Sequence, residues 1–229
     1  MLCVIPAKGR STRIPAKNKK LLCGKPLLQY SIEVAKEFEL FSDIIVSSED
    51  DEILSIAAKE GASPFFRSET LSGDRVRYWE TVEEVLLSHN IIEEPCMILL
   101  PTSPFRQVQD LQVCYNLYHN KNCEAVMSVS EVEKLPQHMV IVKDDKLVPL
   151  DEAGTQKRRQ DIQKHYVHDG LCLVVDTGAF LKNQEFYGLS TVPYFSPKER
   201  SLDLDTMLQW QQAEMILKEK ENLNYPNKH

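Results

Sequence analysis

Short apolar runs alternate with segments of helical periodicity along residues 1–130 of this 229-residue chain. The apolar runs predict strands buried on both faces, at residues 2–5, 44–47, 96–100 and 125–129. The segments between them predict helices, at residues 25–38, 48–61, 78–89 and 108–119. Strands that alternate with helices pair in parallel, and the helices cover the sheet. The sequence therefore predicts an α/β fold with a mostly parallel sheet flanked by helices.

The pattern changes between residues 130 and 170. Residues 139–142 and 146–148 predict a hairpin, and residues 151–168 are polar and weakly periodic. Strand and helix patterns then return, at residues 171–175, 177–181, 192–195 and 205–220. We interpret residues 1–229 as a single domain, with residues 130–170 as an excursion that leaves the sheet.

The loop after the first predicted strand concentrates positive charge. The chain as a whole is acidic, with 27 Lys and Arg against 34 Asp and Glu and a net charge of -7. The first carboxylate is Glu33, and the cations before it are Lys8, Arg10, Arg13, Lys17, Lys19, Lys20 and Lys25. Such a cluster focuses positive potential, and Gly9, Ser11 and Thr12 suit a loop that approaches phosphate oxygens. We predict that the loop binds a polyanion; a solvated basic surface loop is the alternative.

A pair of carboxylates, Asp203 and Asp205, lies just before the last predicted helix. In an extended segment, residues two positions apart point to the same side of the chain. Two carboxylates with few other protein ligands suit Mg²⁺, which keeps several waters and shares phosphate oxygens. In the alternative interpretation, Asp205 caps the helix and Asp203 is exposed.

Three loops are expected to meet at one edge of the sheet, because ligands of parallel sheets bind beyond the carboxyl ends of the strands. These loops comprise residues 6–18, 101–106 and 201–205. The sequence contains no P-loop, no GxGxxG motif and no G-x-S-x-G nucleophile motif. A basic loop and an acidic pair without an evident nucleophile indicate phosphoryl or nucleotidyl transfer.

Composition narrows the class of protein and its compartment. Six cysteines without the spacing of a zinc site predict free thiols and a reducing cytosol. No apolar run approaches the ~20 residues of a membrane span, and the early basic residues do not fit a signal peptide. Net acidity, and a basic loop without aromatic residues, argue against a nucleic-acid partner. We expect a cytoplasmic protein that binds neither membranes nor nucleic acid.

Several segments together resemble the signature of the acylneuraminate cytidylyltransferases, the CMP-sialic acid synthetase family. They occur in that family's order and spacing, at residues 5–18, 24–27, 46–50, 66–74, 99–106, 203–206 and 213–214. The resemblance implies a three-layer, Rossmann-like nucleotidyltransferase fold, CTP as co-substrate and Mg²⁺ as cofactor. It implies a nonulosonic acid as acceptor, such as sialic, legionaminic or pseudaminic acid. It also implies a homodimer, in which the excursion at residues 130–170 is a protruding dimerisation arm.

The resemblance further implies roles for individual residues. The nucleotide would be bound by Lys8, Gly9, Ser11, Arg13, Lys17, Asn18, Arg67, Asp74 and Thr102. Lys17 and Arg13 would act in catalysis by stabilising the departing pyrophosphate, and Asp205 would hold the metal together with Asp203. The sugar would be bound by Ser103 and, from the arm, by Lys143, Arg158 and Tyr166.

Three positions differ from the family's usual pattern. Lys8 replaces an arginine and loses its bidentate geometry, and Arg10 replaces a glycine in a turn where positive φ is expected. Leu100 replaces a glutamine before Pro-Thr-Ser, which favours an acceptor other than ordinary sialic acid. Two alternatives stay open. One is a 3-deoxy-manno-octulosonate cytidylyltransferase, which the ending at residues 203–206 disfavours, and the other is a nucleotide-binding domain without catalysis.

Overall fold

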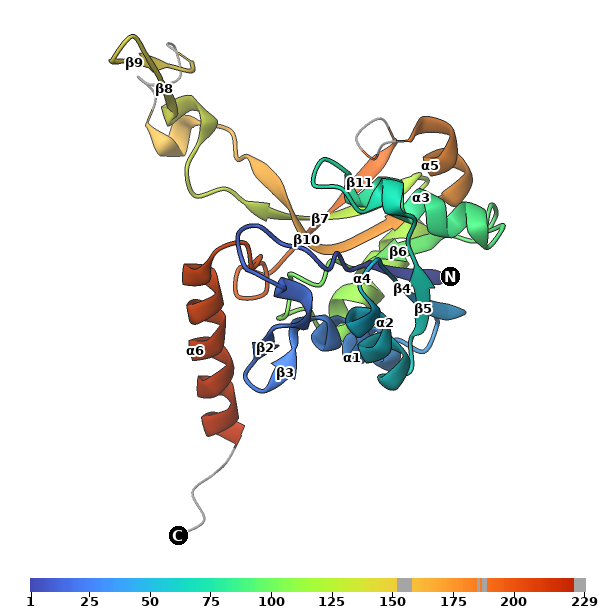
Figure 1. The fold of residues 1–229 in the computed structure, drawn as a ribbon. Helices are drawn as coiled ribbons and strands as arrows, with labels where there is room; N and C mark the ends of the chain where they lie inside the picture. Colours follow the sequence, from blue (N-terminus) through green and yellow to red (C-terminus); the bar gives the residue numbers. More distant parts are fainter. Residues whose placement is uncertain (152–157, 185, 187–188, 225–229) are drawn as a thin grey trace.

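A seven-stranded sheet lies at the centre of the protein, in a computed structural model that describes residues 1–151, 158–184, 186 and 189–224. In spatial order its strands are β11 (Thr191–Phe195), β7 (Ala125–Glu131), β10 (Tyr166–Val175), β6 (Cys96–Ile98), β1 (Leu2–Pro6), β4 (Asp43–Ser48) and β5 (Ser63–Phe66). The helices are α1 (Leu27–Glu37), α2 (Asp51–Lys59), α3 (Tyr78–Ser88), α4 (Val108–Asn120), α5 (Thr177–Asn183) and α6 (Met207–Asn224). Figure 1 shows their arrangement around the sheet.

Most strand pairs in this sheet are parallel. Strands β6, β1, β4 and β5 form parallel pairs, and β11 pairs in parallel with β7. Strand β10 runs antiparallel to both of its neighbours, β6 and β7. The chain leaves the sheet after β7 and returns to it directly as β10, so these two strands form an antiparallel ladder. The prediction of a mostly parallel α/β sheet is confirmed.

Strand β10 begins at Tyr166, whereas the sequence predicted a strand from residue 171. The earlier residues lack an apolar pattern because Tyr166 and Val167 are exposed, at the base of the arm. They nevertheless pair with Ser130 and Glu131 of β7, so the ladder continues beyond the body of the sheet. The register shifts between His168 and Leu173, around Gly170 with its positive φ of 72°. Backbone pairing, rather than burial, defines this part of the strand.

The sheet is covered by helices on both faces. Strand β1 shows the division: Cys3 and Ile5 belong to the core under α1, α2 and α4, and Leu2 and Val4 belong to the core under α3 and α5. All five residues of the strand are buried, which explains its continuous apolar sequence. The three-layer arrangement expected from the sequence is therefore present.

A third apolar cluster holds together the loops at the carboxyl ends of the strands. It includes Ile14 of the basic loop, Phe105 of the 101–106 loop, Leu204 between the two aspartates, and Trp210 of α6. A small two-stranded sheet, β2 (Leu21–Leu22) with β3 (Lys25–Pro26), leads from the basic loop into α1. The loops that were predicted to meet therefore share one apolar core.

The excursion contains the predicted hairpin, formed by β8 (Val140–Lys143) and β9 (Lys146–Pro149). Figure 1 shows this hairpin projecting away from the body of the molecule, with the beginning of β10 leading back from it. Short 3-10 turns flank it at Pro136–His138 (η3) and Arg159–Asp161 (η4). Among the described residues, no helix has both the length and the apolar character that crossing a membrane requires.

Candidate active site

A cavity of about 460 Å³ lies where the three predicted loops meet, beyond the carboxyl end of β1. It is lined by Pro6, Lys8, Arg10, Ser11, Thr12, Arg13, Lys17, Asn18, Asp74, Tyr78, Leu100, Pro101, Thr102, Asp203 and Asp205. Every residue predicted to bind nucleotide or metal lines this cavity except Gly9 and Arg67. The fold thus brings together positions from both ends of the chain, while the roles assigned to them stay predictions.

The basic loop is fixed by a short 3-10 turn, η1 (Lys17–Lys19), which follows Ala16 with its positive φ of 52°. The Asn18 amide donates a hydrogen bond to the Lys8 carbonyl at 2.8 Å, which ties the two ends of the loop together. Lys19 Nζ lies 2.8 Å from carboxylate oxygens of both Asp50 and Glu52, at the start of α2. Lys19 therefore anchors the loop to α2, whereas Lys17 lines the cavity.

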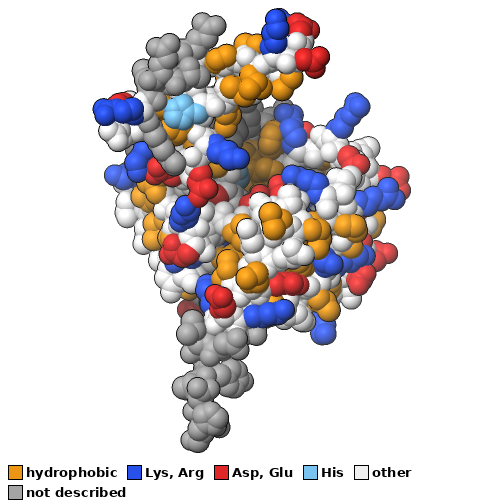
Figure 2. All heavy atoms as spheres, turned by 90° about the vertical axis from the view of Figure 1, so that its left-hand side faces the viewer, with side chains coloured by type: hydrophobic (Ala, Val, Ile, Leu, Met, Phe, Trp, Pro, Cys, Tyr) orange, Lys and Arg blue, Asp and Glu red, His pale blue; other side chains and the backbone are white. Residues whose placement is uncertain are grey.

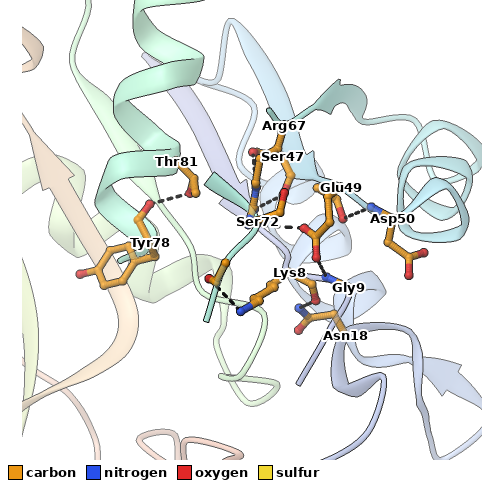
Figure 3. A network of polar contacts seen from close by, with 12 residues as sticks. Lys8, Gly9, Asn18, Ser47, Glu49, Asp50, Arg67, Ser72, Tyr78 and Thr81 are labelled. Carbon is orange, nitrogen blue, oxygen red and sulfur yellow. Dashed lines mark hydrogen bonds and ion pairs between the residues drawn. The ribbon is translucent and has the colours of Figure 1, made fainter. Parts of the chain in front are cut away.

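Gly9 is needed for packing against the start of α2. A Cβ atom at this position would lie 2.6 Å from the Cβ of Asp50, which is closer than real contacts allow. The Gly9 N–H donates to Oε1 of Glu49 at 2.8 Å, as Figure 3 shows. The expected approach of the Gly9 backbone to a phosphate stays a prediction. Arg10 is not among the residues with positive φ, so its side chain causes no strain there.

Arg67 is buried directly behind the basic loop, with only 3% of its side chain exposed. Its guanidinium donates to the Ser47 carbonyl at 2.6 Å and lies 3.6 Å from the Glu49 carboxylate (Figure 3). Burial lowers the pKa of Arg67, although Glu49 opposes the shift. Arg67 lines a separate cavity of about 100 Å³ together with Lys8 and Tyr78, both of which also line the main cavity. Arg67 also lines a cavity of about 440 Å³ together with Arg10, which lines the main cavity as well. Its predicted role in the nucleotide pocket therefore requires a ligand that extends from the main cavity into one of these two neighbouring cavities.

Lys8 connects the basic loop to the turn after the 3-10 segment η2 (Glu69–Leu71). Its Nζ lies 2.6 Å from the Asp74 carboxylate and 3.0 Å from the Gly73 carbonyl. The hydrogen bond from Lys8 holds the pKa of Asp74 below its ordinary value. Lys8 therefore spans two loops on the same side of the cavity.

Asp205 is the centre of an ion-pair network inside the cavity. Arg13 Nη1 lies 2.8 Å from its Oδ2, and Lys17 Nζ lies 3.1 Å from its Oδ1. Lys17 also donates to the Leu204 carbonyl at 2.8 Å. Helix α6 is capped by other groups, because Thr206 and Gln209 exchange hydrogen bonds in its first turn. The Asp205 carboxylate thus faces the cations of the basic loop and is not the helix cap of the alternative interpretation.

Asp203 is half-buried, and its Oδ1 is a buried oxygen without a hydrogen-bond partner. Burial raises the pKa of Asp203 and the Asp205 carboxylate adds to the shift, whereas Thr102, Lys17 and Arg13 oppose it. A buried carboxylate oxygen that lacks a donor is unfavourable unless a cation binds it. Asp203 and Asp205 both line the cavity, and carboxylate oxygens are the hard ligands that Mg²⁺ prefers, so the residues present fit this metal.

The loop between β6 and α4 is supported from below by a buried arginine. Arg106 is 3% exposed, and its guanidinium donates to Ser31 Oγ at 2.8 Å and to the carbonyls of Leu100 at 2.7 Å, Gly170 at 3.1 Å and Leu171. Burial lowers the pKa of Arg106 to about 10. Sequence reasoning included this residue in a motif but gave it no role. The available signal was that Arg106 is the only lysine or arginine between residues 96 and 119.

The predicted sugar-binding residues lie outside the cavity. Ser103 is 1% exposed, and its hydroxyl donates to the Asp169 carbonyl at 3.3 Å, so it supports the loop from inside. Lys143 and Arg158 are exposed on the arm, where Arg158 pairs with Asp161 at 2.8 Å. Tyr166 packs on Phe195, with ring centroids 4.9 Å apart. A single chain does not bring these side chains to the cavity.

The sequence of residues 2–224 matches the family described as Cytidylyltransferase. A pseudaminic acid cytidylyltransferase of Campylobacter jejuni is 32% identical over 95% of this chain and 96% of its own length. A CMP-N,N'-diacetyllegionaminic acid synthase of Legionella pneumophila is 28% identical over 95% and 96%, respectively. An N-acylneuraminate cytidylyltransferase of Streptococcus agalactiae is 32% identical over 90% of this chain, which spans only 50% of that protein.

Solved structures support the fold at lower sequence identity. A CMP:2-keto-3-deoxy-manno-octonic acid synthetase complexed with CTP is 14% identical, with a TM-score of 0.70 over 96% of this chain and 98% of that one. A 4-diphosphocytidyl-2C-methyl-D-erythritol synthase from Anaerococcus prevotii has a TM-score of 0.66 over 94% and 97%, at 13% identity. At these identities the likeness concerns the fold alone. With the match to the family over residues 2–224, it follows that the chain belongs to the cytidylyltransferase family.

Proposed function

We infer that this protein transfers CMP from CTP to the anomeric hydroxyl of a nonulosonic acid and releases pyrophosphate. The single observation that carries the proposal is the cavity in which the cations of the basic loop face Asp203 and Asp205. The names of the relatives indicate the acceptor class, because pseudaminic, legionaminic and N-acylneuraminic acids are all nonulosonic acids. The alignments with the pseudaminic and legionaminic acid enzymes cover nearly all of this chain and nearly all of each relative. The activity that their names state is therefore compared over the whole length of this chain.

The chemistry is an in-line displacement at the α-phosphorus of CTP. The anomeric oxygen forms a bond to phosphorus, the bond from phosphorus to the bridging oxygen breaks, pyrophosphate leaves and the hydroxyl proton passes to solvent. Arg13 and Lys17 bind the phosphate oxygens and stabilise the charge that develops on the leaving pyrophosphate. Both cations contact Asp205, so they lie beside the acidic pair.

Asp203 and Asp205 would hold Mg²⁺, whose chemistry is to neutralise phosphate charge and orient the reacting oxygens. The buried Oδ1 of Asp203 is the oxygen that most needs a cation. The Leu204 N–H between the two aspartates donates to the Thr102 carbonyl at 2.9 Å, which fixes the pair relative to the loop after β6.

The acceptor is proposed to enter beside Leu100 and Tyr78, which line the cavity. Gly170 packs against Leu100, because a Cβ atom at position 170 would lie 3.0 Å from Leu100 Cδ1. An apolar side chain at position 100 offers no hydrogen bond to a sugar hydroxyl. This wall supports an acceptor with fewer hydroxyls at that place than ordinary sialic acid.

A homodimer and a cytoplasmic location are part of the proposal. The arm hairpin exposes Val142 to 73% and Leu147 to 72%, and Figure 2 shows hydrophobic side chains gathered on the arm at the top of the view. Apolar side chains that extend from the body in this way support burial against a second copy. None of the six cysteines, all of which lie among the described residues, forms a disulfide, which supports a reducing compartment.

The test is to incubate the purified protein with CTP, Mg²⁺ and a panel of pseudaminic, legionaminic, N-acetylneuraminic and 3-deoxy-manno-octulosonic acids. We expect pyrophosphate release together with a CMP-sugar of the expected mass, and preference for one of the first two acids. If only 3-deoxy-manno-octulosonic acid were turned over, the proposed acceptor class would be wrong and the protein would be an octulosonate cytidylyltransferase. CTP binding without turnover on any acid would favour a nucleotide-binding domain without catalysis.

A further inference from the structure

The segment that carries Asp203 and Asp205 has no helix or strand of its own. Between the end of β11 and the start of α6, residues 196–206 form only turns and irregular backbone. Functional side chains have to be held within about 0.5 Å of their working geometry. Other parts of the fold must therefore fix this segment, which raises the question of which contacts do so.

One anchor lies between the two aspartates. The Leu204 N–H donates to the Thr102 carbonyl at 2.9 Å, and the Leu204 side chain is fully buried in the apolar cluster with Trp210. This anchor fixes one point of the segment. A single point still leaves the backbone before Asp203 free to change direction, so a second fixed point is required upstream.

Arg200 provides the second anchor, three positions before Asp203. Its Nη2 lies 2.9 Å from Oδ1 of Asp110, in the first turn of α4, and its Nη1 donates to Oε1 of Gln107 at 2.7 Å. The Asp110 carboxylate also accepts hydrogen bonds from Tyr194 Oη at 2.5 Å and from the Gln107 N–H at 2.8 Å. One carboxylate thus joins α4, strand β11 and the segment that leads to the aspartates.

Because the ion pair between Arg200 and Asp110 is largely buried, it holds the two side chains in one relative position. The Asp110 side chain is 0% exposed and that of Arg200 is 18% exposed. A buried carboxylate that loses its cation leaves an uncompensated charge, so the pair resists separation. The same loop contains a contrasting pair, Lys198 with Glu133, whose side chains are 83% and 70% exposed. Solvent screens that pair, and it imposes little on the path of the backbone.

We propose that Asp110 and Arg200 are positioning residues that hold Asp203 and Asp205 in the geometry that binds a divalent cation. Neither residue lines the cavity, so both act through the backbone of the acidic segment. The inference rests on the proposed function, because the cation is the one expected at these aspartates. It adds to that function the support that makes two loop carboxylates into a defined site.

The test compares Mn²⁺ binding by isothermal titration, in the presence of CTP and without acceptor. Supporting groups of metal sites commonly change affinity by roughly 10- to 100-fold, so we expect Arg200→Met to weaken Mn²⁺ binding about tenfold. Arg200→Lys, which keeps the charge, recovers part of the loss. Lys198→Met, the matched control from the same loop, binds Mn²⁺ like the unaltered chain. CTP affinity measured without metal stays the same in all three variants.

A second variant covers the case in which Arg200→Met does not fold, because that change leaves the Asp110 charge buried without a cation. The double variant Asp110→Asn with Arg200→Met removes both charges. The new amide oxygen can accept from the Gln107 N–H, and its NH2 group can donate to Tyr194 Oη, the partners that now donate to the two oxygens of Asp110. A cooperative thermal transition by circular dichroism confirms its fold. If this folded variant bound Mn²⁺ as tightly as the unaltered chain, the positioning role would be wrong.

The two proposals fail in different ways. Absence of turnover by the unaltered chain on every acceptor overturns the proposed function, while the comparison of Mn²⁺ affinities still decides the role of Arg200. Turnover combined with equal Mn²⁺ affinity in all folded variants overturns the positioning role alone. An unaltered chain that binds no Mn²⁺ with or without CTP also overturns it.

Discussion

The cavity and the arm differ in how many contacts within the chain fix their side chains. In the cavity, Arg13 and Lys17 reach Asp205 across 192 and 188 positions of sequence, and buried groups such as Arg106 support the loops. On the arm, Lys143 and Arg158 are exposed, and the hairpin leaves large apolar side chains such as Val142 exposed. One chain thus brings together most of the residues predicted to bind the nucleotide, whereas the arm presents exposed apolar side chains that the proposed dimer would bury. Each of the following changes tests this difference.

The largest effect is expected inside the cavity. Lys17→Ala and Asp205→Ala each remove one member of the network that faces the phosphates, and removal of one such electrostatic contact typically lowers kcat roughly 10²- to 10³-fold. Pyrophosphate release with saturating CTP measures the loss. Lys59→Ala, an exposed lysine at the end of α2, serves as the control. Folded Lys17→Ala and Asp205→Ala proteins with unchanged rates would contradict the proposed site.

The next prediction compares the loss of stability when a buried arginine and an exposed arginine are replaced. Arg106→Met removes a guanidinium that donates to Ser31 Oγ and to several carbonyls, and we expect the free energy of unfolding to fall by about 3 kcal/mol. Arg158→Met on the arm removes an exposed ion pair with Asp161 and should change stability by less than about 1 kcal/mol. Urea unfolding measures both values. Equal losses would mean that the arm is as tightly built as the cavity.

A change on the arm tests the proposed dimer. Val142→Asp combined with Leu147→Asp places charges on two exposed apolar positions of the hairpin. Burying one such apolar side chain contributes about 1.5–3 kcal/mol, so the dimer should weaken roughly 100-fold or more. Sedimentation velocity measures the association, and nucleotide titration checks that CTP still binds. A dimer of unchanged affinity would mean that the hairpin is not the interface.

The smallest effect is expected for Asp50, a change in the free energy of unfolding, because this residue supports the basic loop through Lys19. Asp50 caps α2 through hydrogen bonds from the N–H groups of Glu52 and Ile53, and Lys19 binds the same carboxylate. Although burial opposes ionisation, these contacts together hold the pKa of Asp50 below its ordinary value. Its stabilisation is therefore present above the unfolded-state pKa and is lost as pH falls through the folded-state pKa.

Asp50→Ala should accordingly lower the free energy of unfolding by about 1 kcal/mol at neutral pH. Below pH ~4, in the range where carboxylates protonate, the difference from the unaltered chain should shrink. Urea unfolding across this pH range measures both parts. A difference that stays constant down to pH ~3 would show that the ionised carboxylate contributes nothing to the cap.

Sequence patterns identified much of the fold because they follow local rules. The buried strand at residues 2–5, the helices and the hairpin at residues 140–149 all depend on spacings of two to four residues, which the chain shows directly. The edge of the sheet at which the three loops meet also followed from the parallel pattern. The start of β10 at Tyr166 did not, because only backbone pairing with β7 defines it.

The sequence by itself determined the order of strands and helices, the basic loop and the acidic pair, since charge and periodicity are properties of neighbouring residues. Only the tertiary structure decided what each side chain does there. It gave Gly9 its role against Asp50, buried Ser103 under its loop, made Asp205 a partner of Lys17, and joined Arg200 to Asp110. The reason is physical: those contacts link residues tens to hundreds of positions apart, and their energy depends on burial that no local pattern encodes.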